Sequence, residues 1–266
     1  FVIPASLFSN PSFSMFIDED EVDRFFISES GLDGQALVRQ GTISYQGTTG
    51  EEFFLNATAR DQFLAEFGNG ADDDGSGTVA ILEIAQAFQM AVKAGKSPKR
   101  SILFLQVTGE EKGLLGSRYY TDVAPIFPLA NTVCNLNIDM IGRIDDKHKT
   151  DTNYLYLIGS DKLSTELHTI SETINKKYID INIDYKYNDI NDPNRFYYRS
   201  DHYNFAKNNV PVIFYFNGSH ADYHKPSDTP DKIQYDLLET RTRLVFYTAW
   251  ELANRENRIK LNPKKV

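Results

Sequence analysis

Two adjacent glutamates, Glu110 and Glu111, follow the apolar run SILFLQV at residues 101–107. Like charges at this spacing repel, and burying them is unfavourable unless a metal ion, an arginine or a shared proton compensates. Gly109 and Gly113 frame the pair, and both would ease a turn that re-aims one of the two side chains. The pair is therefore a candidate for metal binding or acid–base chemistry.

Other carboxylates and imidazoles lie where further predicted strands end or helices begin. They are Asp72, Asp73 and Asp74 in GADDDGSG, Asp139 after NLNI, Asp201 and His202 in SDHYNF, and His220 and His224 in SHADYHKPSDT. Oxygen ligands with one or two histidines and no thiolate favour zinc, with manganese or cobalt as alternatives. Each residue alone has an ordinary explanation, such as helix capping for the aspartates or a solvated turn for the glutamates. Because several of them end separate buried strands, the set indicates a metal site.

Alternating helix and strand patterns predict how these residues are positioned. Residues 77–94 have apolar side chains at helical spacing, with Ser76 as a plausible cap. Strands are expected at 101–107, 135–140, 153–159, 179–187 and 211–218, and further helices at 113–123, 162–178 and 235–255. This order predicts an α/β fold, in which a largely parallel sheet carries helices on both faces. Active sites of such sheets gather where the strands end.

Composition excludes several classes of protein. The net charge of −9 over 266 residues argues against nucleic acid or an anionic membrane surface as a partner. The single cysteine, Cys134, excludes an intrachain disulfide and a cysteine-built zinc cluster. No stretch reaches the roughly 18 apolar residues of a membrane span, and no signal peptide is visible in this chain.

Five segments carry a family resemblance. GADDDGSG, TGEEKGLLGS, NIDMIGR, SDHYNFAK and DYHKPSDT occur in this order and resemble the signatures of the zinc aminopeptidases of peptidase family M28. The resemblance runs from about residue 52 to the C-terminus. It implies a single three-layer α/β domain with a mixed, mostly parallel sheet, a two-zinc site, a peptide substrate and export to the periplasm, cell surface or exterior. It implies nothing about the oligomeric state.

The resemblance also implies the metal ligands. Asp72 would bridge the two zinc ions, and Glu111 and His224 would complete the first zinc site. Asp139 would serve the second site. The peptide bond between Asp72 and Asp73 would be cis, as the bond after the bridging aspartate is in this family.

Two further residues receive catalytic roles from the same resemblance. Glu110 would be the general base that takes a proton from zinc-bound water, whose pKa the metal lowers toward 7. Tyr223 would donate a hydrogen bond to the developing oxyanion. One glutamate of the pair would thus hold the metal while its neighbour acts on the water.

One departure from the family pattern concerns the second zinc. The family has a His-x-Asp segment on the strand before GADD, and the best register here places Arg60 and Gln62 at those positions. The guanidinium of Arg60 could neutralise Asp139 and Asp72 in place of a metal ion, or it could point to solvent at a strand end. His220 is not expected to substitute for the missing ligand. We therefore expect one tightly bound zinc per chain instead of two.

Three functions are consistent with this pattern. The first is a zinc-dependent metallo-aminopeptidase, an exopeptidase with an impaired second metal site. The second is a catalytically weak or inactive relative that binds peptides or proteins. The third is a single-zinc enzyme like the glutaminyl cyclases, which EEKGLLGSRYY, in its aminopeptidase form, makes the least favoured.

The chain is expected to contain two parts. Residues 46–266 form the M28-like metallopeptidase domain. Residues 1–45 resemble the end of a protease-associated domain that some members of the family insert or append.

Overall fold

A computed structural model describes residues 37–45, 48–55 and 69–263. β1 (Leu37–Tyr45) and β2 (Thr48–Leu55) form an antiparallel hairpin, whose register shifts between Arg39 and Gly41. This hairpin spans the expected boundary at residue 45, and that boundary stays a prediction.

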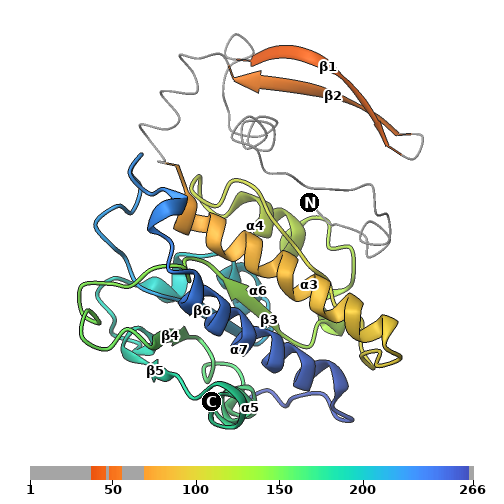
Figure 1. Cartoon of the computed structure of the whole chain (residues 1–266). Helices are drawn as coiled ribbons and strands as arrows, with labels where there is room; N and C mark the ends of the chain where they lie inside the picture. The colour runs from red at the N-terminus through yellow and green to blue at the C-terminus, as the bar shows by residue number, and fades with distance from the viewer. Residues whose placement is uncertain (1–36, 46–47, 56–68, 264–266) are drawn as a thin grey trace.

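A mixed four-stranded sheet forms the centre of the fold (Figure 1). Its strands are β3 (Asn135–Ile138), β4 (Tyr154–Ile158), β5 (Asn182–Asp184) and β6 (Val212–Phe216), in the order β3-β6-β4-β5. β3 is parallel to β6, β4 is parallel to β5, and β4 is antiparallel to β6. The expected mixed, mostly parallel sheet is confirmed.

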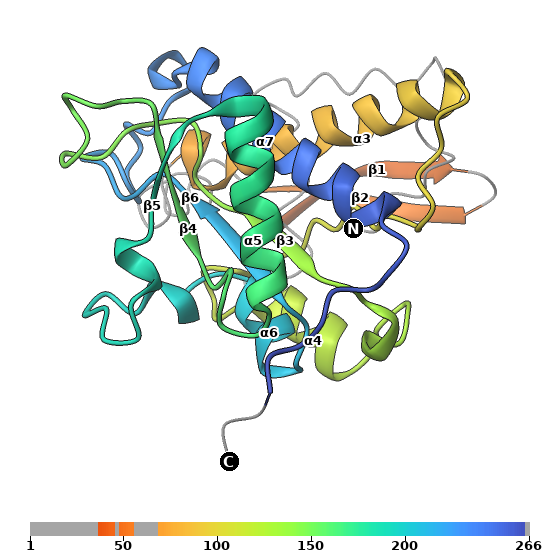
Figure 2. The same cartoon turned by 90° about the horizontal axis from the view of Figure 1, so that it is seen from below.

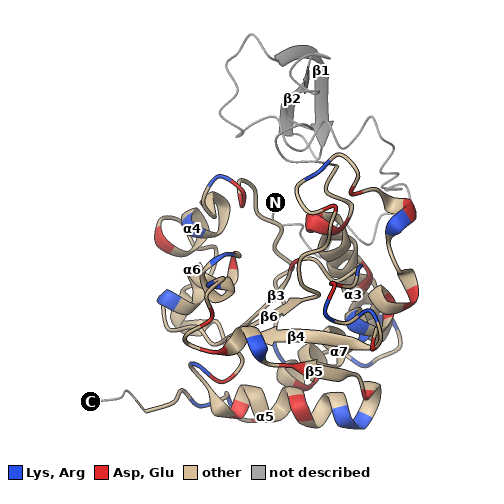
Figure 3. Cartoon of the chain, turned by 90° about the vertical axis from the view of Figure 1, so that its left-hand side faces the viewer, with Lys and Arg blue, Asp and Glu red and all other residues tan. Residues whose placement is uncertain are grey.

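Helices cover both faces of this sheet. They are α3 (Gly77–Lys93), α4 (Leu115–Asp122), α5 (Thr165–Ile174), α6 (His202–Lys207) and α7 (Tyr235–Asn254). Figure 3 shows α4 and α6 on one side of the strands and α3 and α7 on the other. In Figure 2, α5 lies beside α7. The expected three-layer α/β domain is confirmed.

Burial on both faces explains why β4 and β6 are apolar at every position. Alternate residues of a strand point to opposite faces, and all five residues of each strand are buried. On β4, Leu155 and Leu157 pack with apolar residues of α3, α5 and α7. Tyr154 and Tyr156 pack on the opposite face with aromatic residues that include Phe216. Such strands are typical of a central sheet between two helical layers.

A buried arginine fastens α7 to the sheet. Arg241 is 1% exposed and its Nε donates to the carbonyl of Tyr154 at 3.0 Å. Its Nη1 donates to the carbonyls of Ile141 and Arg143 at 2.7 and 2.6 Å. The loop that follows β3 is thereby held against the last helix.

Two local predictions were wrong. Residues 101–107 do not form a strand ladder, since only Leu105 makes a bridge. Ile102, Leu103 and Phe104 nevertheless pack against the core. The apolar run therefore indicated buried side chains and not strand pairing. Ser76 makes no capping bond, because its hydroxyl instead donates to Asp72.

The fold brings the ends of three segments together. Asp139 follows β3, and the loop after the parallel neighbour β6 carries His220 and His224. The start of α3 lies against the same place, since a Cβ on Gly77 would lie 2.6 Å from the carbonyl oxygen of Ile138. The aspartates that precede α3 therefore face the ends of β3 and β6.

Candidate metal centre

Asp73, Glu111 and His224 converge on one point. Nε2 of His224 lies 3.1 Å from Oδ2 of Asp73 and 3.1 Å from Oε1 of Glu111. Among the described residues, these three form the group whose donor atoms all lie within 4.8 Å of one another. The side chain of Asp73 is 11% exposed, whereas those of Glu111 and His224 are about a third exposed. The group is thus buried on the side of Asp73 and open to solvent on the side of Glu111 and His224.

This donor set fits a zinc ion. Two ligand atoms bonded to one tetrahedral zinc at about 2.0–2.1 Å lie about 3.3 Å apart, which is close to the separations found here. Oδ2 of Asp73 and Nε2 of His224 are buried and make no hydrogen bond of ordinary geometry. Buried polar atoms are normally satisfied. Two buried ligand atoms that lie 3.1 Å apart without such a bond therefore fit a site that holds a cation between them.

The structure does not bring Asp72 into this group. Asp72 is fully buried, and its Oδ1 accepts hydrogen bonds from the Ser76 hydroxyl at 2.8 Å and the Gly142 N–H at 2.7 Å. Its Oδ2 faces Nε2 of His220 at 3.1 Å. Asp73, and not the predicted Asp72, is therefore the aspartate whose carboxylate lies with Glu111 and His224. The three aspartates are alike in the sequence, and only the backbone turn decides which one faces Glu111 and His224.

The backbone around the site has two unusual features. The cis peptide bond lies between Asp73 and Asp74, one residue later than expected. His224 and Met140, the residue after Asp139, have positive φ angles of 55° and 59°. Non-glycine residues rarely adopt this conformation, and where they do, the surrounding structure must hold them.

The two glutamates lie in a tight turn, which was expected to direct their side chains to different places. Gly109 and Gly113 both have positive φ, at 69° and 102°. The carbonyl of Glu110 accepts hydrogen bonds from the N–H groups of Gly113 and Leu114 at 2.9 and 2.8 Å. The turn leads directly into α4, so Glu111 joins the metal-binding group while Glu110 lies beside it.

Glu110 lies among other carboxylates. Burial, followed by the charges of Asp139, Glu111 and Asp201, raises the pKa of Glu110 to about 10. Burial and the charge of Asp73 likewise raise the pKa of Glu111. A divalent cation among these groups would offset their mutual repulsion, which again fits a metal site.

Asp139, which was expected to serve a second metal ion, lies near the carboxylates of Asp73 and Glu111. Its Oδ2 accepts a hydrogen bond from the Ser200 hydroxyl at 2.7 Å, and its Oδ1 is buried without a partner. Burial and the charge of Asp73 raise the pKa of Asp139 well above its usual range. Arg60 and Gln62, the residues expected at the other ligand positions of this site, lie outside the described residues.

Tyr223 lies at the exposed side of the centre. Its ring stacks on the His224 imidazole with centroids 3.9 Å apart, and its hydroxyl accepts a hydrogen bond from Nη2 of Arg199 at 3.2 Å. Burial raises the pKa of Tyr223, so the hydroxyl keeps its proton and can donate it in a hydrogen bond.

Two other polar residues noted in the sequence, Asp201 and His202, are not part of the metal-binding group. Asp201 accepts a hydrogen bond from the Ser117 hydroxyl, and burial raises the pKa of this aspartate to about 6. His202 is fully buried, with neither ring nitrogen in a hydrogen bond of ordinary geometry, and it stacks on Phe214 at 4.7 Å. His202 is therefore a core residue and not a ligand.

The fold and this donor set are those of an α/β protein with a candidate carboxylate–histidine metal centre. Peptidase family M28 matches residues 46–249, which is most of the chain. The sequence is 32% identical over 165 residues to leupeptin-inactivating enzyme 1 of Streptomyces exfoliatus, covering 62% of this chain and 32% of that protein. It is 28% identical over 206 residues to aminopeptidase YwaD of Bacillus subtilis, covering 75% of this chain and 41% of that protein.

A solved structure shows the same fold. The zinc aminopeptidase BSAP from Bacillus subtilis matches with a TM-score of 0.56 at 24% identity, covering 73% of this chain and 45% of that one. The chain belongs to peptidase family M28, so the resemblance seen in the sequence is confirmed. The chain spans only about a third to two fifths of the length of the two curated relatives. In the part of the chain that the structure describes, no helix is long and apolar enough to cross a membrane.

Proposed function

We propose that the chain is a zinc-dependent metallopeptidase of aminopeptidase type. Asp73, Glu111 and His224 would hold one zinc ion, and Glu110 would be the general base. The single observation that carries this proposal is the convergence of three donor atoms with two of them buried and unsatisfied. Membership of a peptidase family and likeness to named aminopeptidases support the choice of substrate.

The residues of the chain would divide the reaction among them. A bound zinc ion would supply the positive charge that polarises a peptide carbonyl and acidifies water. The carboxylate of Glu110 would accept a proton from the attacking water and return it to the leaving amine. The hydroxyl of Tyr223 would donate a hydrogen bond to the oxygen of the scissile carbonyl. Arg199, which donates to that hydroxyl, would hold it in place.

We propose further that the second metal position is impaired. Asp139 offers one free carboxylate oxygen there. Structural zinc usually has four protein ligands and catalytic zinc three. Asp139 and a shared Asp73 fall short of this number if Arg60 and Gln62 occupy the histidine and aspartate positions of the family. One zinc ion per chain is the expected stoichiometry.

Metal content and hydrolysis, measured on the same variants, test the proposal. Protein purified without chelators should contain one zinc per chain by mass spectrometry, and Glu111→Ala should lose it. Glu110→Gln should keep the zinc but lower the turnover of aminoacyl anilides by roughly 10²–10⁴-fold. Glu83→Gln, which changes an exposed carboxylate on α3, is the matched control and should alter neither quantity.

Each result has a defined meaning. Loss of zinc from Glu110→Gln would show that the roles of the two glutamates are exchanged. Zinc binding by the wild type without any anilide turnover would overturn the catalytic part and leave a peptidase-fold binding protein. Absence of zinc from the wild type after titration would overturn the proposal as a whole.

A further inference from the structure

The loop between β6 and α7 carries His224 and is attached to the turn that carries Asp73. The attachment is Asp228, which lies four residues after His224 and is 1% exposed. Its Oδ2 accepts hydrogen bonds from the backbone N–H groups of Asp72 at 2.9 Å and Asp73 at 3.3 Å. One buried carboxylate thus joins the two segments that contribute Asp73 and His224.

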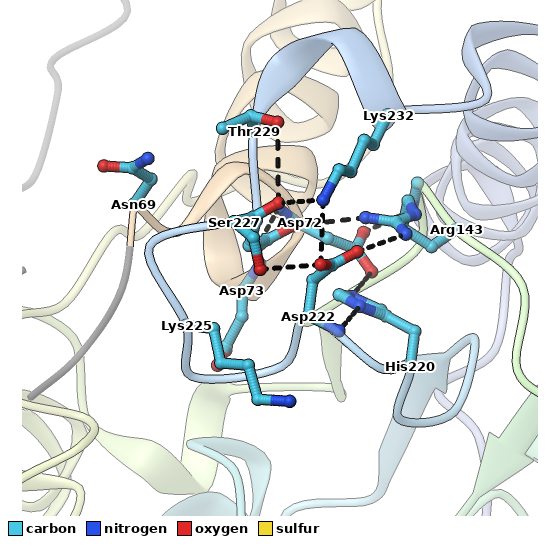
Figure 4. A network of polar contacts seen from close by, with 12 residues as sticks. Asn69, Asp72, Asp73, Arg143, His220, Asp222, Lys225, Ser227, Thr229 and Lys232 are labelled. Atoms are coloured by element: carbon cyan, nitrogen blue, oxygen red, sulfur yellow. Dashed lines mark hydrogen bonds and ion pairs between the residues drawn. The ribbon is translucent and has the colours of Figure 1, made fainter. Parts of the chain in front are cut away.

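Arg143 connects this carboxylate to the rest of the loop. Its Nη1 lies 3.5 Å from Oδ1 of Asp228, and its Nη2 donates to Oδ2 of Asp222 at 2.9 Å. Its backbone N–H donates to the side chain of Asn217, at the start of the loop, at 2.7 Å. Lys232, near the end of the loop, donates to Asp222 at 2.8 Å. Figure 4 shows Arg143 and Lys232 directed toward Asp222.

Asp72 and His220 form a second attachment between the same segments. Nδ1 of His220 accepts the N–H of Asp222 at 3.3 Å, so Nε2 carries a proton and donates it to Asp72 at 3.1 Å. Neither residue lies in the metal-binding group. The contacts therefore serve to hold the backbone and leave the donor atoms of Asp73 and His224 free.

We propose that Asp228, paired with Arg143, is a positioning residue that sets the distance between Asp73 and His224 and thereby the affinity of the metal site. This inference rests on the proposed zinc site. His224 has a left-handed backbone conformation that its surroundings must enforce. Without Asp228, the N–H groups of Asp72 and Asp73 lose their acceptor. The metal would then have to order the loop when it binds.

The test compares variants that remove different parts of this contact. Asp228→Ala removes both the acceptor and the partner of Arg143. Asp228→Asn keeps an oxygen for the two N–H groups but loses the charge that faces Arg143, and Arg143→Met removes the pairing from the other side. Asp145→Asn is the matched control, since Asp145 is equally buried and bonds to Tyr156 and His148 instead of the metal-binding segments.

Zinc affinity is measured by competition with a chelating dye, at a temperature where circular dichroism shows every variant folded. Asp228→Ala should bind zinc roughly 10–100-fold more weakly than the wild type, as is typical when an outer-shell partner is lost. Asp228→Asn and Arg143→Met should lie between the two. The visible absorption of the cobalt-substituted protein should change in the Asp228 variants. Asp145→Asn should lower the melting temperature but leave the zinc affinity and the cobalt spectrum unchanged.

The outcomes separate this inference from the proposed function. If the wild type binds zinc and Glu111→Ala does not, but the Asp228 and Arg143 variants match the wild type, Asp228 is not a positioning residue. An equal loss of affinity in Asp145→Asn would also overturn the inference, because general loosening would then explain the result. If Glu111→Ala binds zinc as tightly as the wild type, the proposed site itself is wrong. Should Asp228→Ala fail to fold, Asp228→Asn and Arg143→Met decide the question.

Discussion

Acid should destabilise the folded protein through His202, and replacing this histidine by phenylalanine should remove that effect. His202 is 0% exposed, and neither ring nitrogen makes a hydrogen bond of ordinary geometry. Burial lowers the pKa of His202 from 6.5 to about 3, so the folded protein holds the ring neutral. In the unfolded chain the ring takes up a proton below about pH 6.5. The stability contributed by His202 is therefore complete above pH 6.5 and is lost as the pH falls toward 3.

The size of the effect follows from these two pKa values. In the unfolded state the histidine takes up a proton between pH 8 and pH 5. Because pH 5 lies about 1.5 units below the unfolded pKa, this proton stabilises the unfolded state by about 2 kcal/mol. The folded state gains almost no such stabilisation, because pH 5 is well above its pKa of about 3.

The assay is urea unfolding of metal-free protein at pH 8 and pH 5, with the free energy of unfolding extrapolated to water. Wild type minus His202→Phe isolates the histidine. Other groups cancel in this difference, including Asp201, whose raised pKa acts in the opposite direction. At pH 8 the two proteins should differ by less than about 1.5 kcal/mol, because the rings are similar in size. On going from pH 8 to pH 5, the free energy of unfolding of His202→Phe minus that of the wild type should rise by about 2 kcal/mol.

The control for this measurement is Phe214→Leu, which removes the ring that stacks on His202. It should lower the stability at both pH values by about the same amount and keep the acid sensitivity of the wild type. If His202→Phe loses as much stability between pH 8 and pH 5 as the wild type does, His202 is not held neutral in the core, and the reasoning fails.

Two further predictions concern Arg241 and the second metal position. Arg241→Met should destabilise the protein by about 3–5 kcal/mol in urea unfolding, because it removes the donor from two buried carbonyls and one partly buried carbonyl. Arg243→Met, on the exposed side of the same helix, should cost less than about 0.5 kcal/mol, and equal losses would contradict the assigned role. The double variant Arg60→His with Gln62→Asp should raise the zinc stoichiometry from one toward two and increase anilide hydrolysis. Two zinc ions already present in the wild type would show that no ligand is missing.

Elements with a strong burial period were predictable from the sequence. The observed bounds agree within a few residues with the expected ranges for α3, α7, β4 and β6. Each of the two helices buries one side against the sheet, and each of the two strands is buried on both faces. The strand predicted at residues 101–107 was wrong for a physical reason. Apolar side chains report burial, whereas a ladder also requires a neighbouring strand at the correct spacing.

Buried charges were the residues most easily missed. Arg241 carried a usable signal, since it lies three residues after Leu238 and three before Leu244, on the buried stripe of α7. A charged residue on such a stripe indicates a buried partner. Asp228 and Arg143 lie in loops, where no period reports burial. Their pairing across 85 residues becomes visible only once the fold is known.

The choice between Asp72 and Asp73 shows what a spacing argument can and cannot decide. A motif placed the aspartates beside the ends of β3 and β6 correctly, because that placement depends on the sheet. Which of two adjacent carboxylates faces Glu111 and His224 depends on the φ and ψ angles of a single turn, where Asp73 and Asp74 depart from helical values. Asp72 instead lies one helical turn before Ser76 and bonds to it. Beside the helix capping that any of the three aspartates could provide, the i, i+4 spacing of Asp72 to Ser76 is the feature of the sequence that favours a structural role for Asp72 in particular.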